Sequence, residues 1–170
     1  MLIGLDGNEA NVQRRVGVGR YAYELLKQFH KLRRADCEWR IYLKEKPLME
    51  MPLERLDWKY EIIGPKKFWT QFGLPLNLYR QKRRFGVFFT PSHYAPRFSP
   101  YPTVVSIMDL AYLHFPEMFR QKDLWQLRHW TSYSVKKAVR VLTISESSRR
   151  DIINHYQVPK EKVIVTYPGF

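Results

Sequence analysis

Residues 2–23, LIGLDGNEANVQRRVGVGRYAY, run from an apolar segment through a polar loop into the start of a helix. A strand that delivers a glycine-bearing loop to a helix N-terminus presents backbone N–H groups and the positive end of the helix dipole. α/β proteins commonly hold phosphate in this way. Gly17, Val18, Gly19 and Arg20 are therefore candidates for phosphate contact. The pattern is not the complete dinucleotide-binding fingerprint, and the alternative is that both glycines serve only a turn.

Strands and helices alternate along the rest of the chain. Apolar residues recur every three or four positions from Val18 to Leu32 and over residues 117–138, which predicts helices, and a further helix is expected over 146–156. Residues 68–84 are expected to be helical on both sides of Pro75. Apolar or alternating runs predict strands at residues 38–43, 58–63, 86–90, 103–108, 141–144 and 163–166. This order predicts an α/β fold with a doubly wound, mostly parallel, Rossmann-like sheet and helices on both faces.

Polar residues follow four of the predicted strands at their carboxyl ends. In a doubly wound sheet the ligand crevice lies outside those ends, so the four loops are expected to line one cleft. Besides the glycine loop, they supply Asn8, Ser92, His93, Tyr94, Asp109, Ser145 and Glu146. Ser145 also stands where it would cap the helix over residues 146–156.

The composition is that of a globular protein with an unusual charge. The chain has 170 residues, of which 45% are hydrophobic and 15% aromatic, with one cysteine and a net charge of +13. A single cysteine fits a reducing compartment, and no apolar run is long enough to span a bilayer. Asp6 and Glu9 interrupt any signal peptide, so a cytoplasmic location is expected. The positive charge favours polyanions without choosing among nucleic acid, anionic membranes and phosphorylated substrates.

One basic segment is a candidate for a membrane or anion surface. Lys66, Lys67, Arg80, Lys82, Arg83 and Arg84 flank Trp69, which we expect to be exposed. Such residues would hold a protein on an anionic inner leaflet. The alternative is a solvated helix end whose cations complement the helix dipole.

Several motifs, taken together and in order, resemble those of a known family. They are GVGRY at residues 17–21, the segment 103–117 with DLAY and FPE, LTISESSRRDI at 142–152, and the closing run 158–169. The chain resembles the N-terminal domain of a glycosyltransferase of family 4, the retaining enzymes of the two-domain GT-B architecture. The resemblance covers nearly the whole chain.

The resemblance implies an acceptor-side half of an enzyme. Residues 1–170 are then a single Rossmann-like, acceptor-binding domain, and the C-terminal donor domain with its paired glutamates is not among them. The implied reaction moves a sugar from a nucleotide diphosphate to a saccharide or polyprenyl-linked acceptor, in the synthesis of bacterial surface polysaccharide. It implies no metal, no cofactor besides the nucleotide-sugar substrate, and an inactive isolated chain. For such an enzyme, the basic segment predicts a peripheral position on the inner membrane face.

The resemblance also suggests roles for individual residues. His93 is the candidate for holding the transferred sugar or the acceptor hydroxyl, and the alternative is a histidine bonded within its loop. Asp109 is a candidate for orienting the acceptor or acting as a base, and the alternative is a cap of the next turn. Many relatives have histidine where this chain has Met108. Because a thioether cannot donate a hydrogen bond, the role of that histidine is absent here or carried by His93 or Asp109.

A second class of function fits the charge alone. A self-standing basic α/β module would bind nucleic acid or a phosphorylated ligand. The chain shows no RNA-binding signature and no helix-turn-helix pattern, and its basic residues are spread over several elements. We therefore expect no nucleic-acid partner.

Overall fold

The computed structural model describes residues 1–32, 34 and 36–169. The chain divides into two compact units. Unit 1 comprises Met1–Pro91 and Pro96–Pro102, and unit 2 comprises Ser92–Ala95 and the chain from Thr103 onward.

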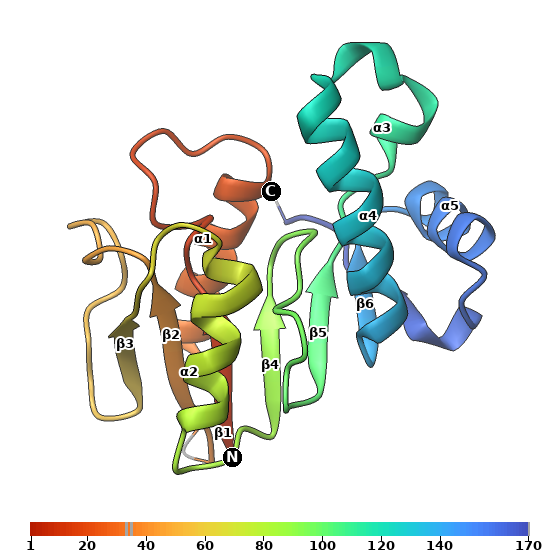
Figure 1. Ribbon diagram of the computed structural model, residues 1–170. Helices are drawn as coiled ribbons and strands as arrows, with labels where there is room; N and C mark the ends of the chain where they lie inside the picture. The colour runs from red at the N-terminus through yellow and green to blue at the C-terminus, as the bar shows by residue number, and fades with distance from the viewer. Residues whose placement is uncertain (33, 35, 170) are drawn as a thin grey trace. The chain divides into compact units, whose positions relative to one another are not determined.

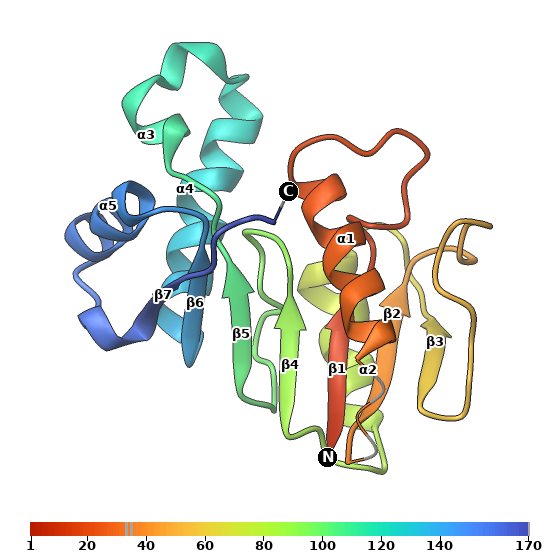
Figure 2. The same ribbon diagram turned by 180° about the vertical axis from the view of Figure 1, so that it is seen from behind.

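Unit 1 is a parallel sheet with helices on both faces. Its strands β1 (Leu2–Asp6), β2 (Glu38–Leu43), β3 (Trp58–Ile62) and β4 (Val87–Thr90) lie in the order β3-β2-β1-β4. Helix α1 (Val18–Lys31) covers one face (Figure 2). The π-helical turn η1 (Trp69–Gly73) continues directly into α2 (Leu74–Arg80), and α2 covers the other face (Figure 1).

Strand β1, which lies between β2 and β4, is buried along its whole length, as a strand covered by helices on both faces requires. A Cβ on Gly4 would lie only 2.6 Å from Phe88 Cδ2, so this position accommodates the neighbouring ring. On the α1 side, Phe29 stacks on Trp39 with ring centroids 5.0 Å apart. On the α2 side, the buried cluster consists of Leu2, Tyr42, Trp69, Leu74, Leu78, Phe85 and Phe88.

Unit 2 contains parallel strands and helices around its own core. The strands β5 (Thr103–Ser106), β6 (Arg140–Thr143) and β7 (Val163–Val165) pair in sequence order. The helical elements are α3 (Ala111–His114), η2 (Pro116–Met118), α4 (Gln121–Lys137), α5 (Glu146–Tyr156) and η3 (Lys160–Lys162). The core includes Val105, Ile107, Val135, Val141 and Ile152.

The predicted fold class is confirmed, with two differences at helix ends. The helix expected from residue 117 begins at Gln121, because Pro116 opens a single 3-10 turn and Phe119 is extended. The helix expected to reach residue 84 ends at Arg80, because Gln81 is extended with φ −65° and ψ 125°.

The prediction that Trp69 is exposed is wrong. Only 2% of the residue is accessible, and its indole Nε1 donates a hydrogen bond of 3.1 Å to the carbonyl of Ile63. The exposed aromatic and aliphatic side chains here are instead Phe68, directly before η1, and Phe72, Leu76 and Tyr79 on η1 and α2, which are 58%, 61%, 52% and 62% exposed. The two sides of this helix are therefore both apolar.

This arrangement predicts that two alanine substitutions on α2 change the free energy of unfolding by very different amounts. Leu78 is fully buried, so Leu78→Ala should lower the free energy of unfolding by about 2–5 kcal/mol. Leu76 is half exposed, and the matched Leu76→Ala should change it by less than about 1 kcal/mol. Urea denaturation measures both values, and equal losses would contradict the assignment of the buried face.

Candidate functional site

The carboxyl end of β1 is fixed by a buried carboxylate. Asp6 Oδ1 accepts hydrogen bonds from the backbone N–H and the side-chain Nδ2 of Asn8, at 3.0 and 2.8 Å. Asn8 Oδ1 in turn accepts from the Lys44 N–H at 2.8 Å, just after β2. Both ends of the Asn8 amide thus join the ends of β1 and β2.

The pKa of Asp6 is raised to about 6, chiefly by burial and to a smaller extent by the nearby Glu9 charge. The two hydrogen bonds from Asn8 and the Lys44 charge lower the pKa but do not offset burial. Sequence reasoning missed Asp6. The signal was available as an acidic residue at a strand end with Asn two positions later, a pattern that closes a local turn.

The predicted phosphate loop leads into α1 through glycine. Gly17 has φ +47°, a conformation that residues with a side chain rarely adopt, and no side chain caps the helix there in the described chain. A Cβ on Gly19 would lie 3.0 Å from the Glu9 carbonyl oxygen, so the first helical turn approaches the preceding loop closely. No side chain therefore covers the start of α1 from the capping position, but the Gly19 N–H already donates to the Val16 carbonyl at 3.0 Å.

Two arginines near this loop have different surroundings. The Arg15 guanidinium lies over the Tyr23 ring at 4.1 Å, and its Nε donates to the Ala10 carbonyl at 2.7 Å. Arg20 is exposed and pairs with Glu24 one helical turn later, at 2.8 Å. Arg15 therefore braces the loop, whereas Arg20 is the more accessible cation.

In unit 2, His93 has a buried ring nitrogen without a partner. Its Nδ1 has no hydrogen-bond partner among the described residues. Burial lowers the pKa of His93 to about 4, and the charge of Asp109 opposes this shift. His93 is therefore neutral at pH 7, with one nitrogen able to donate and the other to accept. An unsatisfied buried nitrogen on a strand-end loop is a candidate ligand contact.

The neighbours of His93 hold its loop to α4. The Ala95 N–H donates to Ser134 Oγ at 2.8 Å, and the Tyr94 ring meets Trp130 edge-on with centroids 5.4 Å apart. Ser92 is buried. These contacts place Tyr94 against a helix, and its predicted contact with an acceptor stays a prediction, as does that of Ser92.

Asp109 and Met108 sit just beyond the end of β5. Asp109 is exposed, and its Oδ1 accepts from the Ala111 N–H at 2.9 Å, so the carboxylate does close the turn into α3. Oδ2 of the same group is left for another contact in a catalytic role, which stays a prediction. Met108 is buried and contributes its backbone carbonyl to a bond from Thr143 Oγ1.

Ser145 caps α5, as its position predicts. Its Oγ accepts from the Ser148 N–H at 3.1 Å. Glu146, in the first turn of α5, pairs with Arg149 at 3.3 Å. Both side chains have structural partners, and a further role in the cleft stays a prediction.

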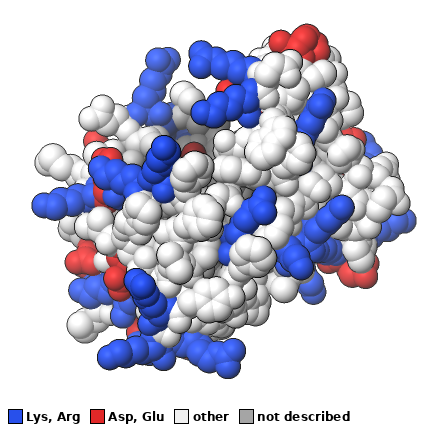
Figure 3. Space-filling model, in the orientation of Figure 1, with Lys and Arg blue, Asp and Glu red and all other residues white. Residues whose placement is uncertain are grey.

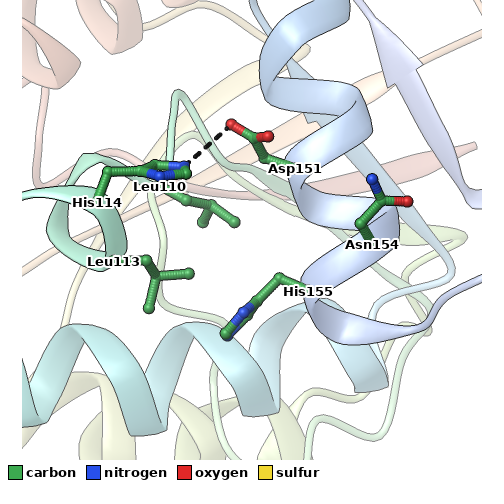
Figure 4. Close-up of a pocket in the computed structure, with 6 residues that line it drawn as sticks. All are labelled: Leu110, Leu113, His114, Asp151, Asn154 and His155. Carbon is green, nitrogen blue, oxygen red and sulfur yellow. Dashed lines mark ion pairs between the residues drawn. The ribbon is translucent and has the colours of Figure 1, made fainter.

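A cavity of about 460 Å³ opens between α3 and α5 in unit 2 (Figure 4). It is lined by Leu110, Leu113, His114, Asp151, Asn154 and His155. His114 Nε2 lies 3.4 Å from Asp151 Oδ2. Sequence reasoning missed this cavity because its two walls are far apart in the chain. Among the described residues, no three His, Cys, Asp or Glu side chains form a group that could hold a metal ion.

The predicted basic surface in unit 1 is partly neutralised. Arg83 forms two hydrogen bonds of 2.7 and 2.8 Å with the Glu38 carboxylate, which lower the pKa of Glu38, and Lys66 pairs with Glu45 at 2.7 Å. Lys67, Arg80, Lys82 and Arg84 are exposed and form no ion pair with any residue the structure describes. No helix within the described ranges is long and apolar enough to cross a membrane.

Comparison with known proteins gives one family and one fold. The sequence model of Glycosyltransferase Family 4 matches residues 16–170. The structure is similar to Anabaena Alr3699/HepE in complex with UDP-glucose, at 16% identity and a TM-score of 0.61, and to the same protein with UDP, at 15% and 0.58. Both matches cover 99% of this chain and 44% of HepE, so the chain spans less than half of that protein. No curated protein matches the sequence.

Substitution of the buried carboxylate should stabilise the protein at neutral pH. A folded-state pKa near 6 against 3.8 in the unfolded chain means that the folded state loses stability as pH rises from about 4 to about 6. Asp6→Asn keeps the acceptor oxygen without the charge, so it should be more stable than the wild type by up to about 3 kcal/mol at pH 7. The difference should vanish below pH 4. Urea denaturation across this pH range measures it, with the exposed Asp123→Asn as the control that should show no such trend.

The His93 ring should titrate far below an ordinary histidine. NMR of 13C-labelled histidine should give a midpoint near pH 4 for the signal that disappears in His93→Gln. Because the Asp109 charge favours the protonated ring, Asp109→Asn should move the midpoint lower still. A midpoint near 6.5 in the wild type would show that the ring is solvated.

Proposed function

The chain belongs to glycosyltransferase family 4, and we propose that it is the acceptor-side N-terminal half of a retaining sugar transferase. The family match over residues 16–170 carries this proposal. The similar fold of HepE, a protein that binds UDP-glucose and UDP in its structures, supports a nucleotide-sugar donor. The missing half would supply most of the donor contacts.

The proposed reaction breaks the bond between the anomeric carbon and the donor diphosphate oxygen. A bond forms from the acceptor hydroxyl oxygen to the same face of that carbon, and the hydroxyl proton passes to Asp109 or to the departing diphosphate. The diphosphate gains negative charge as it leaves, so groups that stabilise anions accelerate this step. A metal-independent transfer must draw these groups from backbone amides, helix dipoles and basic side chains.

The described residues suit these roles in different ways. The loop at Gly17 brings the positive end of α1 to the diphosphate, with Arg20 as an accessible cation, although the Gly19 N–H already donates to the Val16 carbonyl at 3.0 Å. A neutral His93 can donate to or accept from a sugar hydroxyl without attracting the anionic leaving group. Asp109 has a carboxylate oxygen beyond the one that closes its turn.

We further propose the setting of this reaction. The acceptor would be a saccharide or a polyprenyl-linked sugar in the synthesis of bacterial surface polysaccharide. The enzyme would act in the cytoplasm at the inner face of the membrane, without a metal or cofactor and without a nucleic-acid partner. The free cations of the basic segment, Lys67, Arg80, Lys82 and Arg84, support this location.

The proposal predicts that the 170-residue chain alone releases no nucleoside diphosphate from any nucleotide sugar. The chain extended through its natural reading frame should do so, because the extension supplies the donor wall. In the longer protein, His93→Gln should lower kcat about 100-fold or more, as loss of a hydrogen bond to the reacting sugar does. The exposed His129 provides the control, and His129→Gln should retain activity. Turnover by the 170-residue chain would refute the half-enzyme assignment.

A further inference from the structure

The water-facing side of η1 and α2 is a continuous apolar stripe. It consists of Phe68, Phe72, Leu76 and Tyr79, each more than half exposed. Phe68 immediately precedes η1 with φ 54°, whereas Phe72, Leu76 and Tyr79 are three or four residues apart and follow one another along one side of the helix. The first two rings meet edge-on with centroids 6.3 Å apart. Contiguous apolar side chains of this size on a surface mark an interaction site.

Packing within unit 1 does not explain this stripe. The opposite side of the same helix, with Trp69, Leu74 and Leu78, already fills the core against the sheet. A surface helix of a soluble protein normally carries polar residues on its outer side. Here the outer side carries three apolar or aromatic side chains that are each more than half exposed, so the exposed stripe is suited to contact with something outside the unit.

The charges around the stripe select an anionic occupant. No Asp or Glu occurs in the sequence between Glu61 and Asp109. Lys67 stands at the start of the stripe with its Nζ 5.6 Å from the Phe68 ring centroid, and Arg80, Lys82 and Arg84 follow the end of α2. Figure 3 shows this face, mostly uncharged over α2 and with Lys and Arg gathered where α2 ends.

We propose that the stripe Phe68–Phe72–Leu76–Tyr79 inserts into the surface of an anionic lipid bilayer, with Lys67, Arg80, Lys82 and Arg84 bound to lipid headgroups. This assigns the proposed membrane location, on which it builds, to a defined surface. The helix lies parallel to the bilayer, because the apolar residues run along its length rather than gathering at one end. Helices of this kind bury their apolar side about 5–10 Å into the headgroup region.

The chemistry of each residue fits this depth. Transfer of phenylalanine and leucine side chains out of water lowers the free energy, whereas tyrosine favours the boundary where its hydroxyl stays hydrated. Lysine and arginine at the ends of the stripe can extend to phosphates while their methylene stems stay in the apolar layer. A second copy of the chain would cover the apolar side chains, but with a net charge of +13 it would bring further positive charge to the four cations.

Sedimentation with lipid vesicles tests the proposal. The 170-residue chain should bind vesicles of phosphatidylcholine with phosphatidylglycerol at least tenfold more tightly than vesicles of phosphatidylcholine alone, and salt should weaken the binding. Phe72→Ser with Leu76→Ser should reduce binding at least tenfold. Arg80→Gln with Lys82→Gln should reduce binding to the anionic vesicles by roughly fivefold per charge.

Matched controls separate this surface from general stickiness. Leu53 and Leu56 are 79% and 96% exposed in unit 1 outside α2, so Leu53→Ser with Leu56→Ser should bind as the wild type does. Lys122→Gln with Lys160→Gln removes two exposed cations elsewhere and should lower binding far less than the Arg80 and Lys82 pair. A polarity-sensitive dye on Leu76→Cys should shift to the blue with anionic vesicles, and the same dye on Leu56→Cys should not. Cys37 is buried and should not compete for the dye.

Three results would overturn the proposal. Equal binding to neutral and anionic vesicles would remove the role of the cations, and unchanged binding of the Phe72 and Leu76 variant would remove the role of the stripe. Self-association in lipid-free buffer that this variant abolishes would assign the stripe to a second copy. Lipid binding is measured without donor or acceptor, so its failure is distinct from a failure of sugar transfer.

Discussion

The buried carboxylate of Asp6 fixes the end of β1 and with it the start of the glycine loop. Removing a carboxylate from water costs free energy, and here two hydrogen bonds from Asn8 offset only part of that cost. These hydrogen bonds also fix the position of the loop, because the same Asn8 side chain accepts a hydrogen bond from the Lys44 N–H just beyond β2. Two neighbouring strand ends are thereby tied to one loop, and the chain leaves β1 in a defined direction toward α1.

The two units contain buried titratable groups whose shifts oppose each other. The raised pKa of Asp6 makes the folded state bind a proton more readily between about pH 4 and 6. The lowered pKa of His93 makes it bind one less readily in a similar range. The contribution of Asp6 to the free energy of unfolding falls as pH rises, and the contribution of His93 increases. The two effects partly cancel, so little pH dependence of the free energy of unfolding would not show that both are absent. At pH 7 the two groups therefore differ in charge, because His93 is neutral whereas Asp6, with a pKa of about 6, is mostly ionised.

The fold class could be predicted from the sequence because the strands are short runs of apolar or alternating residues that lie between helical repeats. Val87–Thr90 and Thr103–Ser106 lie where their composition predicts, since only a parallel sheet buried on both faces accommodates such runs. Ser145 was predictable as a cap because its hydrogen bond is local. The cavity between α3 and α5 was not found, because its walls are distant in the chain. The local turn of Asp6 and Asn8 could have been recognised, but the burial that raises the pKa of Asp6 depends on the surrounding fold.

Trp69 shows where periodicity fails. Both sides of η1 and α2 are apolar, so a repeat of three and four residues identifies a helix without deciding which side faces the sheet. The structure decides by the hydrogen bond of the Trp69 indole to Ile63 and by Gly73, where a Cβ would lie 3.1 Å from the Gly64 carbonyl oxygen. Trp69 is buried in preference to Phe68 because its indole N–H has a hydrogen-bond acceptor in the core. The backbone of Gly64 approaches Gly73 closely, so the side of the helix that carries Gly73 must face inward. Once that side packs against the sheet, the surface is left for four apolar side chains, Phe68, Phe72, Leu76 and Tyr79. Their exposure is therefore a consequence of how the core of unit 1 is packed.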